Sequence, residues 1–126
     1  MLHHLSIAVS DLDRSSAFYD AVLAALGYLR VWTQADAVGY GIRGNDDLFA
    51  IKHSPVELKV PGTGFHLAFA AHSRAAVEDF HRAALKYGGE DNGEPGLRPA
   101  YGHHYFAAFV FDPDGYRIEA VINEEP

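Results

Sequence analysis

Two histidines in this chain stand at the same place in two copies of a repeated segment. When the sequence is shifted by 62 positions, seven of the 24 residues from position 4 to position 27 fall on identical residues, and His4 falls on His66. A repeat of this length is typical of two copies of one supersecondary unit. Equivalent positions in two such copies have related geometry, so the two imidazoles predict half of a metal site. The alternative is an ordinary hydrogen-bonded histidine at each position.

Other side chains are candidates for proton transfer and substrate contact near such a site. Tyr40, Tyr105 and His104 are the candidate proton donors, because a phenol or an imidazole can orient a substrate or protonate it. Arg98 lies in a turn-rich segment, where it would meet an anionic group. The other candidate substrate contacts are Trp32, Phe49, Lys52, Tyr101 and His103. The alternative for the aromatic residues is a place in the core, and for His103 and His104 a place on the surface. His81 is expected on the surface.

Apolar spacing in the first copy predicts the elements that position these residues. Large apolar residues alternate with small or polar ones from 4 to 9, which predicts a half-buried strand. Asp11 lies in a segment that can cap a helix, and the helical spacing continues to about Leu26. Residues 55–64 are rich in Pro and Gly, which is typical of a linker. Three short runs between the helix and the linker predict strands at 28–33, 37–42 and 47–52.

The second copy begins with the same alternation and ends with a hairpin. A helix is expected from about Ser73 to Tyr87, and the glycines and prolines in residues 90–102 indicate a loop. Two strands at 103–111 and 115–122 flank an Asp-Pro-Asp-Gly turn, which is a strong hairpin signal. We therefore expect each copy to follow the order β-α-β-β-β.

The composition limits the classes of function that we consider. The chain has 126 residues, no cysteine and a formal net charge of −7. Without cysteine, disulfides and thiolate metal sites are excluded, so a metal would be held by imidazole and carboxylate. The acidic charge argues against nucleic acid and anionic membranes as partners. No apolar run approaches the length of about 20 residues that a transmembrane helix needs. A soluble, cytoplasmic protein without a signal peptide is expected.

Two segments, His4 to Tyr19 and Asp112 to Glu119, resemble the vicinal oxygen chelate superfamily. This superfamily contains glyoxalase I, extradiol dioxygenases, fosfomycin-resistance enzymes and bleomycin-resistance proteins. The resemblance covers essentially the whole chain. It implies an α+β fold in a single domain of residues 1–126, with two βαβββ modules, about 1–60 and 61–126, whose strands curve around a cleft. It also implies a small-molecule substrate and a homodimer.

The resemblance further implies a set of metal ligands. The family places them on the first strand of each module and on the last strand of the second, positions that hold His4, His66 and Glu119 here. Alternation agrees for Glu119, because it shares a strand face with Arg117 and Val121 while its neighbours can pack on a helix. Two imidazoles and one carboxylate suit Fe, Mn, Ni, Co or Zn as divalent ions, and they leave coordination positions open for a substrate.

One position departs from the pattern of glyoxalase I. That enzyme needs a glutamate on the last strand of the first module, where this chain has Ile51 or Lys52 near the expected place. Glu57 precedes Glu119 by 62 positions, but it lies in the predicted linker. A cationic Lys52 cannot be an anionic ligand, although it would neutralise a substrate oxyanion if it faced the cleft. The departure therefore disfavours glyoxalase I activity.

Three functions remain from the sequence. The favoured one is a divalent-metal-dependent lyase or dioxygenase that acts on a small substrate chelating the metal through neighbouring oxygens. The second is a metal-free protein of the bleomycin-resistance type that sequesters a cationic drug in an acidic groove. The third is fosfomycin-type thiol transfer, which is disfavoured because the chain has no loop rich in lysine and serine for a phosphonate.

Overall fold

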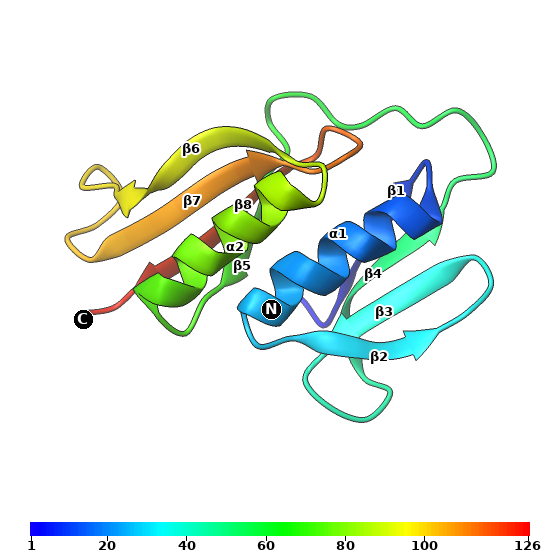
Figure 1. Ribbon diagram of the computed structural model, residues 1–126, viewed down its shortest axis with the longest axis horizontal. Helices are drawn as coiled ribbons and strands as arrows, with labels where there is room; N and C mark the ends of the chain where they lie inside the picture. The colour runs from blue at the N-terminus through cyan, green and yellow to red at the C-terminus, as the bar shows by residue number, and fades with distance from the viewer.

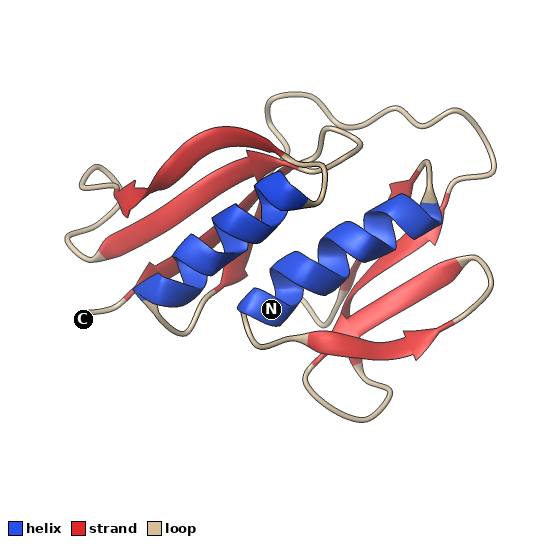
Figure 2. Cartoon of the chain, viewed as in Figure 1, coloured by secondary structure: helices blue, strands red, loops and turns tan.

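The computed structural model describes all residues from Met1 to Pro126 as two four-stranded sheets and two helices (Figures 1 and 2). The strands are β1 (Leu5–Val9), β2 (Leu29–Thr33), β3 (Ala37–Gly41), β4 (Asp47–His53), β5 (Leu67–Ala70), β6 (Glu90–Leu97), β7 (Tyr105–Phe111) and β8 (Arg117–Asn123), and the helices are α1 (Leu12–Ala25) and α2 (Arg74–Lys86). The segment between β4 and β5 is a long loop, in agreement with the predicted linker.

The two sheets have the same strand order and the same strand directions. The first is β1-β4-β3-β2 and the second is β5-β8-β7-β6. β1 is parallel to β4 and β5 is parallel to β8, whereas the other neighbours are antiparallel. The prediction of two equivalent βαβββ modules is therefore confirmed. β1 and β5 are each at one edge of their sheet, and β2 and β6 are at the other, so one side of each of these strands has no strand beside it.

The helices begin at side-chain caps and pack against each other. Asp11 accepts a hydrogen bond from the backbone N–H of Arg14 at 3.0 Å, and Ser73 accepts one from the N–H of Ala76 at 3.0 Å. Such caps satisfy N–H groups that have no partner inside the helix. Figure 1 shows α1 and α2 side by side in front of the two sheets, and their facing sides contribute to one continuous apolar core.

Polar contacts also join the two modules. The hydroxyl of Tyr19 on α1 donates to Asp112, in the turn between β7 and β8, at 2.6 Å. Both side chains are buried. In the same turn, Asp114 forms an ion pair with Arg14 at 2.9 Å. The hydroxyl of Tyr116 donates to the carbonyl of Ala8 in β1 at 2.7 Å. These contacts hold the β7–β8 turn of the second module against the start of the first.

The structure corrects two predictions in the second module. Residues 90–97 form β6 rather than a loop, because an edge strand tolerates glycine and proline where a central strand does not. Its register with β7 shifts around Gly93, which has a φ of 149°. His81 is not a surface residue: it is 9% exposed and its Nε2 lies 2.8 Å from Asp91 Oδ1, which links α2 to β6.

Each sheet has one face against a helix and one face that no helix covers, which we call the open face. In the first sheet, Ile7 pairs with Ile51 on the helix-facing side, and both are buried. Side chains alternate along a strand, so Ser6 and Ala50 lie on the open face. In the second sheet the same alternation places Glu119 on the open face and Ile118 against α2.

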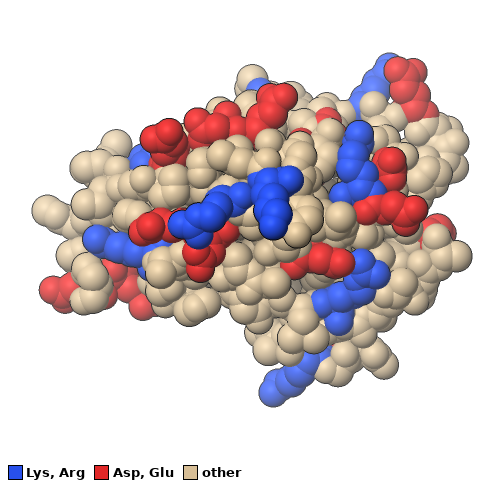
Figure 3. All heavy atoms as spheres, in the orientation of Figure 1, with Lys and Arg blue, Asp and Glu red and all other residues tan.

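On the face shown in Figure 3, basic and acidic side chains are interspersed, so this face does not carry charge of a single sign. Neither helix has the length and hydrophobicity that a transmembrane segment requires.

Candidate active site

Three polar side chains meet on the open face of the second sheet. Glu119, near the middle of β8, pairs with Ala68 of β5 and with Phe109 of β7. Its Oε1 lies 2.5 Å from Nε2 of His66, the residue just before β5, and its Oε2 accepts a hydrogen bond of 2.5 Å from the hydroxyl of Tyr105. The carboxylate side chain is 3% exposed, whereas the imidazole is 40% exposed. We call these three residues, His66, Tyr105 and Glu119, the polar cluster.

The protonation of the polar cluster follows from its contacts. Burial raises the pKa of the Tyr105 phenol to about 12, and its hydrogen bond to Glu119 acts in the same direction. The phenol therefore remains a proton donor at neutral pH. A carboxylate oxygen and an unprotonated imidazole nitrogen are both acceptors, so their approach to 2.5 Å requires a proton or a cation between them. An imidazole nitrogen and a carboxylate oxygen are also suitable ligands for a divalent metal ion.

Cationic and aromatic side chains surround the polar cluster. Arg117, two residues before Glu119 on the same strand face, lies over the Phe111 ring at 5.4 Å, and Arg98 lies over the Phe109 ring at 5.3 Å. An open cavity of about 380 Å³ is lined by Thr63, His66, Tyr101, Tyr105, Phe109, Arg117 and Glu119. The sequence prediction included Tyr101 and Arg98 but omitted Arg117 and Phe109. Strand alternation from Glu119 was the signal that pointed to Arg117, and the strand pairing places Phe109 beside Glu119.

The three predicted metal ligands do not gather in the single chain. His4 is exposed before β1 in the first sheet, and its Nδ1 lies 2.8 Å from Nδ1 of His3. No group of three or more imidazole and carboxylate side chains is arranged to hold a metal ion. His66 and Glu119 are therefore together, while His4 stands at the equivalent place in the other module.

The strand register identifies the first-module counterpart of Glu119. In the second module, Glu119 pairs with Ala68, which is two residues after His66. In the first module, Ala50 pairs with Ser6, which is two residues after His4. The counterpart is therefore Ala50, and not Ile51 or Lys52 as the sequence indicated. Because alanine has no donor atom, this position cannot supply a ligand or a base.

Two predicted site residues lie on the helix-facing side of the first sheet. The hydroxyl of Tyr40 donates to Asp20 of α1 at 2.8 Å, and burial raises the pKa of this phenol well above its ordinary value. The Phe49 ring packs on Tyr19 at 5.0 Å and on Phe69 at 5.2 Å. Both side chains are almost fully buried. Neither side chain therefore lies on the open face of the first sheet, which is the face equivalent to the one that carries the polar cluster in the second module.

The remaining predicted residues lie on the open face or in the loop before β7. Lys52 is exposed at the end of β4, where it pairs with Ala8 and Ala37. Trp32 is half-buried on the open face of the first sheet. The rings of His103 and His104 are 6.2 Å apart, and neither lines the cavity beside the polar cluster.

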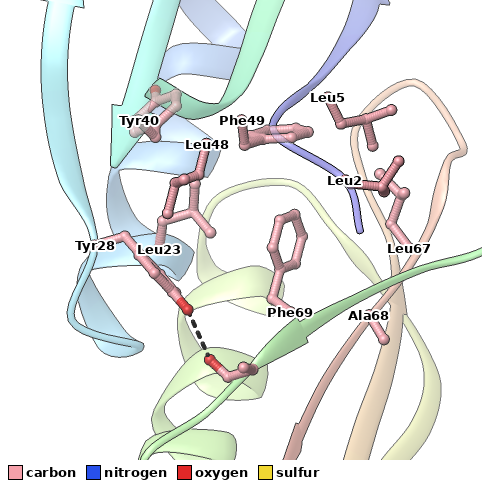
Figure 4. Close-up of a pocket in the computed structure, with 11 residues that line it drawn as sticks. Leu2, Leu5, Leu23, Tyr28, Tyr40, Leu48, Phe49, Leu67, Ala68 and Phe69 are labelled. Atoms are coloured by element: carbon pink, nitrogen blue, oxygen red, sulfur yellow. Dashed lines mark hydrogen bonds between the residues drawn. The ribbon is translucent and has the colours of Figure 1, made fainter. Parts of the chain in front are cut away.

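A separate apolar cavity lies at the seam between the modules. It has a volume of about 250 Å³, and Figure 4 shows leucine and aromatic side chains from both modules around it. The edge strands β1 and β5 both contribute, through Leu5 and Leu67. Leu2 and Leu48 at this cavity are 73% and 45% exposed. The seam therefore leaves large apolar side chains in water next to two unpaired strand edges.

Comparison with known proteins agrees with this architecture. Residues 1–120 match the family described as the Glyoxalase/Bleomycin resistance protein/Dioxygenase superfamily. The lactoylglutathione lyase of Salmonella typhimurium is 32% identical over 128 residues, which cover 95% of this chain and 90% of that protein. A glyoxalase/bleomycin resistance protein from Albidiferax ferrireducens is 32% identical, with a TM-score of 0.81 over 95% of this chain and 96% of that one. A glyoxalase-related enzyme from Fulvimarina pelagi, 21% identical with a TM-score of 0.73, covers 98% of this chain and 88% of that one and shares the fold.

Proposed function

Because this chain belongs to the glyoxalase/bleomycin resistance protein/dioxygenase superfamily, we propose that it is a divalent-metal-dependent enzyme, of the lyase or dioxygenase type, acting on a small substrate with two neighbouring oxygens. The observation that carries this proposal is the contact of Glu119 with His66 at 2.5 Å on an open sheet face, beside a phenol that remains protonated. The likeness to the lactoylglutathione lyase of Salmonella typhimurium supports the lyase type.

We assign a role to each residue of the polar cluster. His66 and Glu119 would hold the ion, and His4 is the third candidate ligand. When bound, the ion would polarise the substrate oxygens and stabilise negative charge that develops on them. Tyr105 orients the Glu119 carboxylate through its hydrogen bond, and its hydroxyl is placed to give a proton to a substrate oxygen. Arg98 and Arg117, neither of which has a carboxylate partner, would bind an anionic group of the substrate.

The proposed site is composite, with two copies of the chain contributing to it. Three features support a homodimer: the unpaired edges of β1 and β5, the exposed Leu2 and Leu48 beside them, and the separation of His4 from Glu119. An unpaired strand edge is a surface that another chain can cover. A two-fold axis would bring β1 of one copy to β5 of the other twice, because such an interface repeats each contact. His4 of one copy would then complete the ligands of the other.

Mixing two inactive variants tests the composite site. His4→Ala and Glu119→Ala each remove one ligand, so each variant alone should lose metal uptake and activity. If the site is composite, a mixed dimer has one site with all three ligands and one site with two changes. Random exchange of subunits should therefore restore about one quarter of the sites. Recovery is measured by zinc content after unfolding and refolding of the mixture. If light scattering shows that the refolded mixture is dimeric and its zinc content does not recover, the site is not shared between copies.

A substrate panel tests the type of reaction. Catechols, and 2-oxo-aldehydes with glutathione, should be turned over or bound only with Fe(II), Mn(II), Ni(II), Co(II) or Zn(II), and the effect should vanish in His66→Ala. Turnover of methylglyoxal with glutathione would require a base other than a glutamate at position 50, where the chain has alanine. Tight binding of a cationic glycopeptide drug that is independent of metal and of His66 would contradict the proposed enzymatic function. It would indicate a protein that sequesters the drug.

A further inference from the structure

The indole of Trp32 in β2 lies on the open face of the first sheet, one strand away from Ala50 in β4, and it covers Gly39 in the strand between them. Trp32 pairs with Gly39 across β2 and β3, and Gly39 in turn pairs with Ala50, the counterpart of Glu119. A Cβ at position 39 would lie 2.7 Å from Cζ2 of the indole and still nearer to Cε2 and Nε1. Glycine is therefore required at position 39 for the indole to lie flat on the strand.

A hydrogen bond holds the indole in this position. Its Nε1–H donates to Asp47 Oδ1 at 3.1 Å, which fixes the ring along the sheet. Ala50 is only 1% exposed although it lies on the open face, so a neighbouring group covers it. The Trp32 indole lies against Gly39, which is the cross-strand partner of Ala50, so the indole is in position to cover Ala50. Trp32 itself remains half-buried, so part of the indole is accessible.

The two open faces thus present different chemistry at equivalent places. In the second module, the paired positions hold Phe109 and Glu119, with Glu119 in contact with an imidazole and a phenol. In the first module, the paired positions are Gly39 and Ala50, and the space above Gly39 contains an aromatic plane. An orientated indole with an accessible surface is a stacking platform for a planar ring.

We propose that Trp32 is a specificity-determining residue that stacks on a planar, conjugated ring of the ligand, while the polar cluster of the other copy holds the two oxygens of that ligand. This inference rests on the proposed function, because it requires the open faces of two copies to meet. It assigns the substrate class as oxygen chelators attached to an aromatic or conjugated ring. The alternative is that the indole only fills the space above Gly39 and contacts no ligand.

Two hydroxamic acids test the stacking. Benzohydroxamic acid and cyclohexanecarbohydroxamic acid chelate zinc through the same two oxygens and differ in whether the ring is planar. Binding to the zinc-loaded protein is measured by calorimetry. Fluorescence gives a second readout, because Trp32 is the single tryptophan of the chain. We expect the planar compound to bind about threefold to tenfold more tightly than the saturated one, as for other aromatic pairs, and to quench the emission of Trp32.

Variants separate stacking from packing. Trp32→Leu should remove the preference for the planar ring, Trp32→Phe should keep part of it, and Gly39→Ala should reduce it by displacing an intact indole. Circular dichroism checks that each variant folds, and Trp32→Phe carries the test if Trp32→Leu does not. Tyr87→Leu changes an exposed aromatic residue elsewhere and should leave the preference unchanged.

The outcomes distinguish the two proposals. Binding that depends on Glu119, with a ring preference that depends on Trp32, supports the inference. If Glu119→Gln weakens both hydroxamates but the ring preference is the same in Trp32→Leu, Trp32→Phe and the parent chain, the stacking role is wrong and the metal site stands. If Glu119→Gln changes the binding of neither compound, the proposed function fails, and the inference fails with it.

Discussion

The two modules have the same backbone but different chemistry on their open faces. In the second module, Glu119 is held between His66 and Tyr105. In the first module, the equivalent place holds Ala50, with the Trp32 indole against its strand partner Gly39. The repeated scaffold therefore sets the positions of these side chains but not their chemical roles. One module presents a carboxylate on its open face, whereas the other presents an aromatic ring.

The helices show the same divergence at one pair of positions. Tyr19 and His81 are equivalent under the shift of 62 positions, and both are buried. Tyr19 donates to Asp112 in the other module, whereas His81 pairs with Asp91 in its own module. The same position of the repeat therefore links the two modules through Tyr19 in the first module. In the second module it links α2 to β6 through His81.

Of the substitutions that test this difference between the modules, replacement of the Glu119 carboxylate should have the largest effect. Glu119→Gln keeps the shape of the side chain but removes its charge, so it makes the second face resemble the neutral first face. Metal affinity should fall about a thousandfold or more, because binding free energies of about 10–16 kcal/mol for structural zinc are divided among only a few ligands. The measurement is zinc titration by calorimetry. Glu57→Gln, the same change in the linker, is the matched control and should bind zinc normally.

A second change makes the first face resemble the second. Ala50→Glu should lower the free energy of unfolding by about 2–4 kcal/mol, because the new carboxyl is buried and displaces the indole. Adding Trp32→Ala opens the space and should return part of that loss. A double-mutant cycle by urea unfolding measures the coupling between the two positions. Additive effects would show that the indole does not cover residue 50.

Removing the contact between modules should have a smaller effect on stability. Tyr19→Phe leaves a buried Asp112 oxygen without its donor, which should cost about 1–3 kcal/mol in the free energy of unfolding. Tyr87→Phe removes the hydroxyl of an exposed tyrosine and should change little. Urea unfolding of both variants gives the comparison. Equal stability of the two would mean that the Tyr19 hydroxyl does not stabilise the seam.

Asp112 should also give the seam a pH dependence. Burial raises the pKa of this carboxyl above its ordinary value of 3.8, although the hydrogen bond from Tyr19 opposes the shift. A carboxyl with a raised folded-state pKa stabilises the fold most below its ordinary pKa. That contribution is lost as the pH rises through the folded-state value. The free energy of unfolding of the parent chain, relative to that of Asp112→Asn, should therefore decrease as the pH rises from 3.8.

The smallest expected effect concerns the phenol of the polar cluster. The pKa of Tyr105 is raised from 10.0 to about 12, so its protonated form is favoured by folding. Its contribution to stability is complete below pH 10 and is lost as the pH rises through 12. The difference between the ultraviolet titrations of the parent chain and Tyr105→Phe should show one tyrosine ionising in that range. If this tyrosine ionises near pH 10 instead, neither burial nor the hydrogen bond to Glu119 acts on its phenol as the structure indicates.

Local patterns in the amino-acid sequence predicted most of the helices and strands, and the family resemblance predicted the fold and one part of the site. Alternation, the helix caps and the Asp-Pro-Asp-Gly turn depend on residues close together in the chain, so they identified every strand except β6, both helices and the closing hairpin. The repeat predicted that His4 and His66 are equivalent, and the family resemblance added Glu119. β6 was missed because its glycines and proline are compatible with a bulged edge strand as well as with a loop.

Tertiary structure decided which residues meet, because contacts between strands depend on register and on the length of the intervening segments. The shift of 62 positions does not hold beyond the helices, so only strand pairing identified Ala50 as the counterpart of Glu119. Pairing also placed the Trp32 indole on Gly39, and side-chain packing joined Tyr105 to Glu119 and His81 to Asp91. The separation of His4 from the polar cluster depends on how the two modules pack, which no local pattern in the sequence specifies.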